Sequence, residues 1–268
     1  MTTFHLGTQS WTFLPDWTGP FYPPGIASAD LLGFYAQIFQ SVEVNATFHA
    51  IPRLSTVLGW RERTPDDFVF ALKTPRAITH ESRLNLDDAE PLVLAFLQAA
   101  AELGPKLGPI LIQLPPSFDR TPANRVLLAR YLDRMPADKQ RFAVEFRHPT
   151  WADSSVEGAL RDRNVAWVMA DGGANHQVTL LTADFAYVRW GRSGQEFPDF
   201  STVRLERSHD LDWWASTLKA LPSGIGTVYG YMSDEFAGHA PASLRQIQAR
   251  LGIPTIDPKS KWPQPSLF

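Results

Sequence analysis

A set of polar residues stands near the carboxyl ends of segments in which apolar and polar side chains alternate. In the segment 42–45, two valines alternate with Glu43 and Asn45. Residues two positions apart in a strand share a face, so Glu43 and Asn45 lie on the same side. Helix-like runs precede and follow the segment, as they do around a buried parallel strand. A buried polar side chain is costly without partners, and this face therefore predicts a site.

The same alternation recurs along the other predicted strands. We expect the bulky apolar side chains to face surrounding helices, and the smaller or polar-ended set to face the axis of the sheet. In a (β/α)8 barrel the carboxyl ends of the strands carry the active site. Packing alone does not account for so many polar strand ends, which predict a functional pocket. The residues assigned to the mouth of this pocket are Glu43, Asn45, Lys73, Gln113, Glu145, Arg147, Asp171, Arg189 and Tyr231.

The residue types in this set indicate two kinds of chemistry. Lys73, Arg147 and Arg189 suit an anion, because the planar fork of arginine matches phosphate or carboxylate. Glu43 and Glu145 could act as general acid and base if neighbouring charges separate their pKa values. A static network of buried ion pairs would use the same residues, so both interpretations stay open. Besides these cations, the residues predicted to contact the ligand are Asn45, His80, Gln113, Asp171 and Tyr231.

Three histidines on loops after predicted strands raise a second possibility. His80, His148 and His239 could join the strand-end acids in a metal site with nitrogen and oxygen ligands. Such a site would fit a metal-dependent phosphoesterase acting on nucleic acid or nucleotides. No HExxH or other tight ligand spacing supports it, so a structural role is favoured for each histidine. No metal ligand is assigned, and the cofactor is unknown.

Other reaction classes find less support. The large barrel glycosidase clan places its carboxylates after the fourth and seventh strands, where this chain has Gln113 and Arg189. Nucleophile elbows, Walker loops and Ser-His-Asp signatures are absent. The glycines at 224–230 precede a predicted strand, whereas a dinucleotide-binding loop follows one.

Strand and helix patterns alternate from end to end, which predicts an α/β protein with one (β/α)8 TIM barrel over residues 1–268. An open doubly wound sheet is the alternative, and the missing glycine-rich loop after the first strand counts against it. Residues 253–268 form a proline-rich tail, which we expect to lie over the surface without regular structure. The stretch 171–184 is irregular, so any sixth helix is weak or missing. The predicted strands are 5–10, 42–45, 68–73, 109–114, 142–147, 165–170, 185–190 and 227–232. The predicted helices are 30–39, 54–63, 88–103, 122–135, 156–163, 210–221 and 240–251.

The composition narrows the class of protein further. The 268 residues carry a formal net charge of -3, so no global basic field favours nucleic acid as a partner. The chain has no cysteine, which excludes disulfides, iron–sulfur clusters and thiol catalysis. No apolar run approaches membrane-spanning length and no signal peptide is recognisable, so we expect a cytoplasmic protein without membrane contact. The oligomeric state is not indicated.

Several stretches in order resemble the DUF72 family of YecE-like proteins over nearly the whole chain. Two of them are Val42-Glu43-Val44-Asn45-Ala46-Thr47-Phe48 and Val144-Glu145-Phe146-Arg147-His148-Pro149-Thr150-Trp151, and the others lie at 7–11, 17–23, 70–73, 79–80, 113–118, 187–189 and 238–241. The resemblance implies a TIM barrel and brings no assigned reaction. Two departures from the family pattern stand out. Met232-Ser233-Asp234 replaces the usual Asn-Asn pair, and Trp190-Gly191 replaces a frequent His-Gly pair.

The sequence leaves three functional hypotheses open. The leading hypothesis is an enzyme-like barrel that binds a small anionic ligand, including a phosphorylated one, with Glu43 and Glu145 in proton transfer. The second is the metal-dependent phosphoesterase. The third is a non-catalytic protein that binds a ligand or a protein partner, which the aromatic, proline-rich loops at 11–17 and 21–25 would also fit.

Overall fold

The computed structural model describes residues 2–171, 180–191 and 194–263. All strands are parallel and form one sheet in the order β6-β5-β4-β3-β2-β1-β9-β8-β7. They are β1 (Thr3–Gln9), β2 (Ser41–Val44), β3 (Val69–Lys73), β4 (Leu107–Gln113), β5 (Phe142–Glu145), β6 (Ala166–Trp167), β7 (Met169–Asp171), β8 (Phe185–Trp190) and β9 (Thr227–Met232).

The two ends of the sheet meet in one short segment. Only Val168 separates β6 from β7; β6 pairs with β5, and β7 pairs with β8. The backbone N–H of Val168 also donates to the carbonyl of Val144 at 2.9 Å. Residues 166–171 thus act as the single sixth strand of an eight-strand ring, and the predicted TIM barrel is confirmed.

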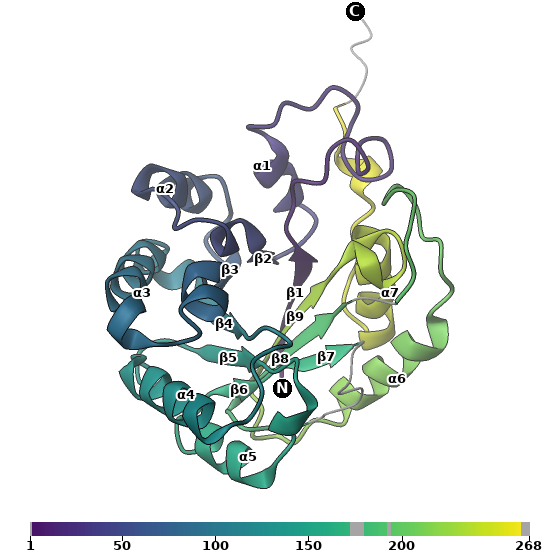
Figure 1. The fold of residues 1–268 in the computed structure, drawn as a ribbon. Helices are drawn as coiled ribbons and strands as arrows, with labels where there is room; N and C mark the ends of the chain where they lie inside the picture. The colour runs from purple at the N-terminus through teal and green to yellow at the C-terminus, as the bar shows by residue number, and fades with distance from the viewer. Residues whose placement is uncertain (1, 172–179, 192–193, 264–268) are drawn as a thin grey trace, which may run out of the picture.

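Seven α-helices surround the strands in the described part of the chain (Figure 1). They are α1 (Leu31–Tyr35), α2 (Leu54–Glu62), α3 (Leu86–Ala101), α4 (Pro122–Arg134), α5 (Ser154–Arg161), α6 (Ser208–Lys219) and α7 (Ala240–Leu251). The prediction of a weak or missing helix over 171–184 falls mostly on residues 172–179, which lie outside the described residues; residues 180–184 contain no α-helix. Across all the residues that the structure describes, no helix has the length and apolar character needed to cross a bilayer.

Short helical turns join several strands to the helices that follow. They are η1 (Asn45–Phe48), the π-helical η2 (Ala77–Glu81), η3 (Gly104–Lys106), η4 (Pro149–Trp151), η5 (Asp234–Phe236) and η6 (Pro258–Lys261). Two of them differ from the sequence prediction. The second strand ends at Val44 because Asn45 already begins η1, and the proline-rich tail contains η6.

Local sequence signals fix where several helices begin and end. Thr121 accepts a hydrogen bond from the N–H of Asn124, and Pro122 occupies the first turn of α4, where a missing N–H costs nothing. Gly252 ends α7 with φ 78°, a left-handed conformation that glycine adopts readily. The fifth strand ends at Glu145, so the predicted strand is too long by two residues.

Side chains from alternate strand positions fill the inside of the barrel, as predicted. The inner cluster consists of Ala71, Leu111, Ala143, Ala166, Val168, Phe185, Tyr187, Tyr229 and Tyr231. A larger apolar cluster on the outer face of the strands packs against the helices. The barrel is therefore solid below its carboxyl-terminal mouth, and the polar residues that follow on the same inward rows rest on this packed floor.

Gly7 of β1 allows the backbones of β1 and β2 to approach closely. A Cβ atom at this position would lie 1.9 Å from the carbonyl oxygen of Ser41. We expect Gly7→Ala to lower the free energy of unfolding by about 3 kcal/mol, because backbone atoms cannot move aside as a flexible side chain would. Urea denaturation measures the change.

Gly158→Ala is the matched control, because an added Cβ in the middle of α5 meets no atom within 4 Å. We expect this variant to be more stable by about 0.5–1 kcal/mol, the helix preference for alanine over glycine. Equal effects of the two substitutions would contradict the close approach of β1 and β2.

Candidate functional site

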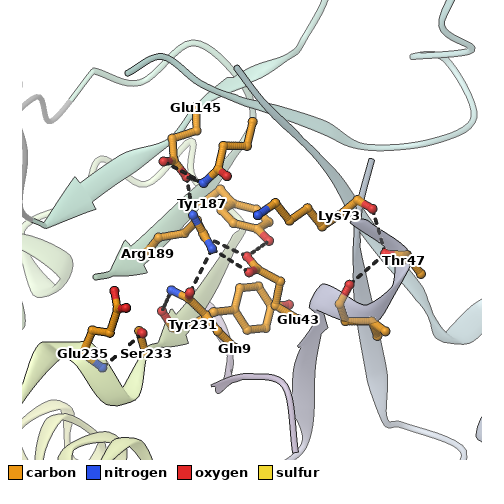
Figure 2. A network of polar contacts seen from close by, with 12 residues as sticks. Gln9, Glu43, Thr47, Lys73, Glu145, Tyr187, Arg189, Tyr231, Ser233 and Glu235 are labelled. Carbon is orange, nitrogen blue, oxygen red and sulfur yellow. Dashed lines mark hydrogen bonds and ion pairs between the residues drawn. The ribbon is translucent and has the colours of Figure 1, made fainter. Parts of the chain in front are cut away.

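Arg189, at the carboxyl end of β8, is the centre of a buried polar network in the barrel mouth (Figure 2). Its Nε and Nη2 donate to the two oxygens of Glu43 at 3.0 and 2.9 Å. Its Nη1 donates to Oε2 of Glu145, and Nη2 also donates to Oε1 of Gln9 at 2.8 Å. The arginine side chain is 8% exposed, the Glu43 side chain 0% and the Glu145 side chain 7%. Arg189 thus joins two carboxylates across the barrel.

The strand register explains how these side chains meet. Gln9 lies beside Glu43 in the β1–β2 pair, and Gln113 lies beside Glu145 in the β4–β5 pair. All four residues lie at or next to the carboxyl ends of their strands, on the inward rows. Because inward rows converge on the barrel axis, an arginine side chain from β8 can reach both pairs.

Further donors fill the remaining positions of both carboxylates. The hydroxyl of Tyr187 donates to Oε2 of Glu43 at 2.7 Å. The amide nitrogen of Gln113 donates to both oxygens of Glu145 at 2.9 Å, and Nε of Arg147 donates to Oε1 at 2.9 Å. Buried charges need this degree of pairing, because an unpaired one costs several kcal/mol.

The surroundings of Glu145 hold this carboxyl in its ionised form. Burial alone would raise its pKa, but the charges of Arg189 and Arg147 and the hydrogen bonds from Arg147 and Gln113 outweigh burial and lower the pKa to about 2. A carboxylate with so low a pKa is a weak base at neutral pH. Glu145 therefore fits the orientation of Arg189 and Arg147 better than it fits proton transfer.

Lys73, at the end of β3, differs from the other charged residues of the mouth. Its Nζ lies 3.9 Å from the centre of the Phe48 ring, and it makes no hydrogen bond or ion pair with any residue that the structure describes. Burial and the charge of Arg189 lower its pKa to about 8, although Glu43 and Glu145 act in the opposite direction. Figure 2 shows the side chain extending from β3 toward the space between these two carboxylates.

Thr47 fixes the aromatic neighbour of Lys73. Its hydroxyl lies 2.8 Å from the carbonyl of Val44 and 2.7 Å from that of Lys73, so η1 is held against the end of β3. This contact places Phe48 of η1 under the ammonium group. The cation–π contact is worth about 0.5–2 kcal/mol, depending on desolvation.

His80 and Arg147 lie close to Lys73. His80 contacts the Phe48 ring edge-on at a centroid distance of 5.0 Å, and its Nδ1 lies 2.9 Å from the hydroxyl of Thr79. Burial and the charges of Lys73 and Arg147 lower the pKa of His80 to about 4, so the ring is neutral near pH 7. The Arg147 side chain is 44% exposed, and only its Nε is engaged with a described residue.

Asn45 lies at the first position of η1, beyond the end of β2. Its Oδ1 is buried and has no hydrogen-bond partner among the described residues. The sequence alternation placed Asn45 on the same face as Glu43, but the strand ends before it. Asn45 is therefore near the mouth without being part of the Arg189 network.

The expectation that Asp171 faces the mouth is wrong. Its carboxylate pairs with Arg207 at 2.8 Å and accepts a hydrogen bond from Trp214 of α6 at 3.3 Å. Trp167 and Met169 share the face of Asp171 and belong to the outer apolar cluster, whereas Val168 belongs to the inner one. The bulk of Trp167 and Met169 turns this face toward the helices, and Asp171 goes with it.

Tyr231 faces inward but lies in the floor under the mouth. It is fully buried, and its hydroxyl is 2.9 Å from Oγ of Ser41 at the start of β2. Its backbone carbonyl accepts a hydrogen bond from Nε2 of Gln9 at 3.3 Å. Tyr231 thus supports the network from below, and a ligand contact for it remains a prediction.

Two members of the network, Gln9 and Tyr187, were not among the predicted site residues. The alternation His5, Gly7, Gln9 carries the signal for Gln9, because His5 stacks on Tyr229 inside the barrel and Gln9 shares its row. Tyr187 stands two residues before Arg189 and so shares its face. Applying the strand-end rule to the first strand would have found Gln9.

The three histidines proposed for a metal site do not come together. His148 caps η4 through Thr150, and His239 lies at the start of α7 with Nδ1 2.7 Å from the carbonyl of Phe200. His80 contacts Phe48, as described above. In the part of the chain that the structure describes, no group of three or more His, Cys, Asp or Glu side chains is placed to hold a metal ion.

The aromatic loop after β1 is packed into the protein. Trp17, Phe21 and Tyr22 are fully buried, and Nε1 of Trp17 donates to Oδ1 of Asp234 at 3.1 Å. Asp234 also accepts from the N–H of Ala240 at 2.6 Å. Burial raises its pKa to about 7, against the opposing effect of these two hydrogen bonds. The packing of these rings supports a structural role for them, and not a wall that faces a ligand.

The residues that depart from the family pattern make defined contacts within the fold. Asp234 joins the loop after β1 to the start of α7 through the contacts above, and Ser233 accepts from the N–H of Glu235. Trp190 is fully buried and packs edge-to-face against Trp214 of α6 at 6.0 Å. Trp190 thus faces the helices, whereas Arg189 faces the axis.

A cavity of about 440 Å³ opens between α4 and α5, away from the mouth. Its walls are mostly apolar and include Val126, Trp151 and Leu160. No member of the Arg189 network lines it. The outer cavity is therefore a feature of the helical layer that is separate from the Arg189 network.

A parallel (β/α)8 barrel with charged side chains converging at its carboxyl-terminal mouth defines a TIM-barrel protein with a candidate polar site. The profile of the family described as "Protein of unknown function DUF72" matches residues 5–266, and the chain belongs to this family.

Relatives and solved structures agree with this assignment. The chain is 35% identical over 169 residues to the UPF0759 protein YecE of Escherichia coli (strain K12), covering 61% of this chain and 59% of the relative. It is 32% identical over 134 residues to the UPF0759 protein YunF of Bacillus subtilis, covering 48% and 47%. The matched segments thus span about half to three fifths of these relatives.

Two solved structures show the same fold. A DUF72 family protein from Thermotoga maritima is similar with a TM-score of 0.78 and 25% identity, covering 93% of this chain and 99% of that one. A DUF72 family protein from Enterococcus faecalis has a TM-score of 0.76 at 19% identity, covering 98% and 100%. The second likeness supports the fold alone.

The low pKa of Glu145 predicts how stability changes in acid. A carboxyl whose folded pKa is depressed from 4.5 to about 2 contributes stability above pH 4.5, and this contribution is lost as the pH falls toward 2. We expect the free energy of unfolding to fall between about pH 4.5 and 2 less steeply in Glu145→Gln than in the parent protein. Urea titrations at several pH values measure this slope, and parallel curves would show that Glu145 is not held ionised by folding.

Proposed function

We propose that this protein binds a small anionic ligand, such as a phosphorylated or carboxylated metabolite, at the carboxyl-terminal mouth of its barrel. The observation that supports the proposal most is the pair of cations Lys73 and Arg147. Both lie beside a network whose carboxylates are already occupied, and both keep donors that no described residue engages. Unused donors of buried or half-buried cations are what an anion requires.

The charged groups that act on Lys73 support the same ligand class. They are Arg189, Arg147, Glu43 and Glu145, so this group together with protonated Lys73 has three positive charges and two negative ones. An excess of positive charge among partly desolvated side chains attracts an anion more strongly than the same charge in open water.

The proton-transfer role that the sequence favours for Glu43 and Glu145 is assigned differently in this proposal. Both carboxylates hold Arg189, and the low pKa of Glu145 makes it a weak base. Lys73, with a pKa of about 8, changes charge close to neutral pH. We therefore assign orientation of the arginines to Glu43 and Glu145, and exchange of a proton with the ligand to Lys73.

Arg147→Gln and Lys73→Gln should each weaken binding of inorganic phosphate by about tenfold, because a charge-assisted hydrogen bond contributes about 1.5–3 kcal/mol. Isothermal titration calorimetry with phosphate measures the affinity. Affinity should also fall as the pH rises through about 8, because Lys73 then loses its proton. Lys73→Arg should remove that pH dependence.

Arg134→Gln is the matched control, because Arg134 is 43% exposed and makes one Nε contact to Glu90 at 2.8 Å, much as Arg147 does to Glu145. It stands at the end of α4, which runs antiparallel to the strands and so ends at the opposite face of the barrel. Equal loss of affinity in Arg134→Gln and Arg147→Gln would contradict a site in the mouth. Turnover of the bound ligand separates an enzyme from a binding protein.

A further inference from the structure

The chain contains two buried lysines whose ammonium groups have opposite surroundings. Lys106 is 5% exposed, and its Nζ donates to the carbonyls of Arg61 at 2.6 Å and Thr64 at 2.7 Å. Lys73 is 9% exposed, and its Nζ has no hydrogen-bond acceptor among the described residues. Lys106 is thus a structural cation bonded to the backbone. The amine of Lys73 is buried over an aromatic ring and donates to no described residue.

The position of Lys73 is also suited to reaction. It stands at the end of β3, with its side chain extending into the mouth toward Arg189, Glu43 and Glu145 (Figure 2). A lysine becomes a nucleophile when burial or a neighbouring cation favours its neutral form. Lys73 has both features, and burial and Arg189 lower its pKa to about 8.

We infer that Lys73 is a nucleophile that forms an imine with the carbonyl carbon of a small anionic aldehyde or keto acid, whose anionic group binds Arg147. The inference rests on the proposed function, since it names the substrate class of the same site. Arg147 supplies the anion contact because its terminal nitrogens face no described acceptor.

The reaction balances without an oxidant or a reductant. The neutral amine attacks the carbonyl carbon; a C–N bond forms and the carbonyl π electrons move to oxygen. The nitrogen loses a proton and the oxygen gains one, which gives a carbinolamine. Departure of the oxygen as water, with a second proton from nitrogen, breaks the C–O bond and leaves C=N. One amine and one carbonyl compound thus yield one imine and one water.

The surroundings of Lys73 would stabilise the product. A protonated imine carries its positive charge where the ammonium now lies, over the Phe48 ring at 3.9 Å. The carboxylates of Glu43 and Glu145, which raise the pKa of Lys73, would favour this cation in the same way. The neutral ring of His80, which contacts Phe48 edge-on, adds no opposing charge.

Reductive trapping tests the inference. The full-length protein is treated with glyoxylate and sodium cyanoborohydride near pH 7, and the six lysines are mapped by peptide mass spectrometry. We expect Lys73 to be modified at least about tenfold faster than any other lysine, because its amine is the one that is both available and easily deprotonated. Lys106 should stay unmodified.

Three variants and a second probe sharpen the test. Lys73→Arg should abolish the fast labelling at position 73. Lys139→Arg on the surface should leave labelling of Lys73 unchanged. Arg147→Gln should slow labelling by glyoxylate about tenfold without slowing labelling by the neutral glycolaldehyde. Equal slowing of both aldehydes, or of neither, would overturn the anionic-carbonyl class.

Phosphate binding separates the two proposals. Preferential labelling of Lys73 that phosphate suppresses supports both. Phosphate binding that depends on Arg147, without preferential labelling of Lys73, overturns the imine and leaves the proposed function standing. Absence of both phosphate binding and labelling overturns the proposed function together with the inference.

Discussion

The contact on which the rest of the site depends is the one between Arg189 and two carboxylates that come from strands not adjacent to β8. Arg189 reaches Glu43 on β2 and Glu145 on β5 from its place on β8. These side chains are almost wholly removed from water, so each charge is acceptable only because the others are present. The network therefore ties three separate parts of the barrel wall to one geometry. Tyr187, Gln113 and Gln9 complete it by filling the hydrogen-bond positions that the ion pairs leave.

This arrangement divides the charged residues of the mouth into two groups. Glu43, Glu145 and Arg189 satisfy one another and form a rigid base for the site. Lys73 and Arg147 lie beside that base with donors that no described residue engages, and the neighbouring fixed charges act on Lys73. Preorganised charge of this kind is what binding sites use to recognise a ligand without paying for rearrangement. In the proposed function, the static network and the binding site, which the sequence presents as alternatives, are two layers of one structure.

Asp171 and Glu43 illustrate how far strand alternation alone can be trusted. Both are acidic residues at the ends of predicted strands, yet Glu43 faces the axis and Asp171 faces α6. On the second strand the residues that alternate with Glu43 are apolar valines. The valines therefore face the helices, and Glu43 faces the barrel axis. On the sixth strand Asp171 shares its face with Trp167 and Met169, whose volume fits between strands and helices but not inside a narrow barrel. Where the polarity of one residue and the bulk of its neighbours favour opposite faces of a strand, the space inside the barrel decides which face turns inward.

By itself the sequence determined the alternation of strands and helices, the closed barrel and most of the residues at its mouth, because period-two alternation and helix-end signals are local. It also located Lys73, Arg147, Arg189, Glu43 and Glu145 at strand ends. Only the tertiary structure decided which of these charges pair and which keep donors that no described residue engages, because that depends on how inward rows from distant strands meet across the axis. The same holds for Asn45 and Asp171, whose directions follow from where a strand stops and what packs behind it. The ion pairs of Arg189, and an amine of Lys73 without a hydrogen-bond acceptor in the described part of the chain, exist only once the barrel has closed.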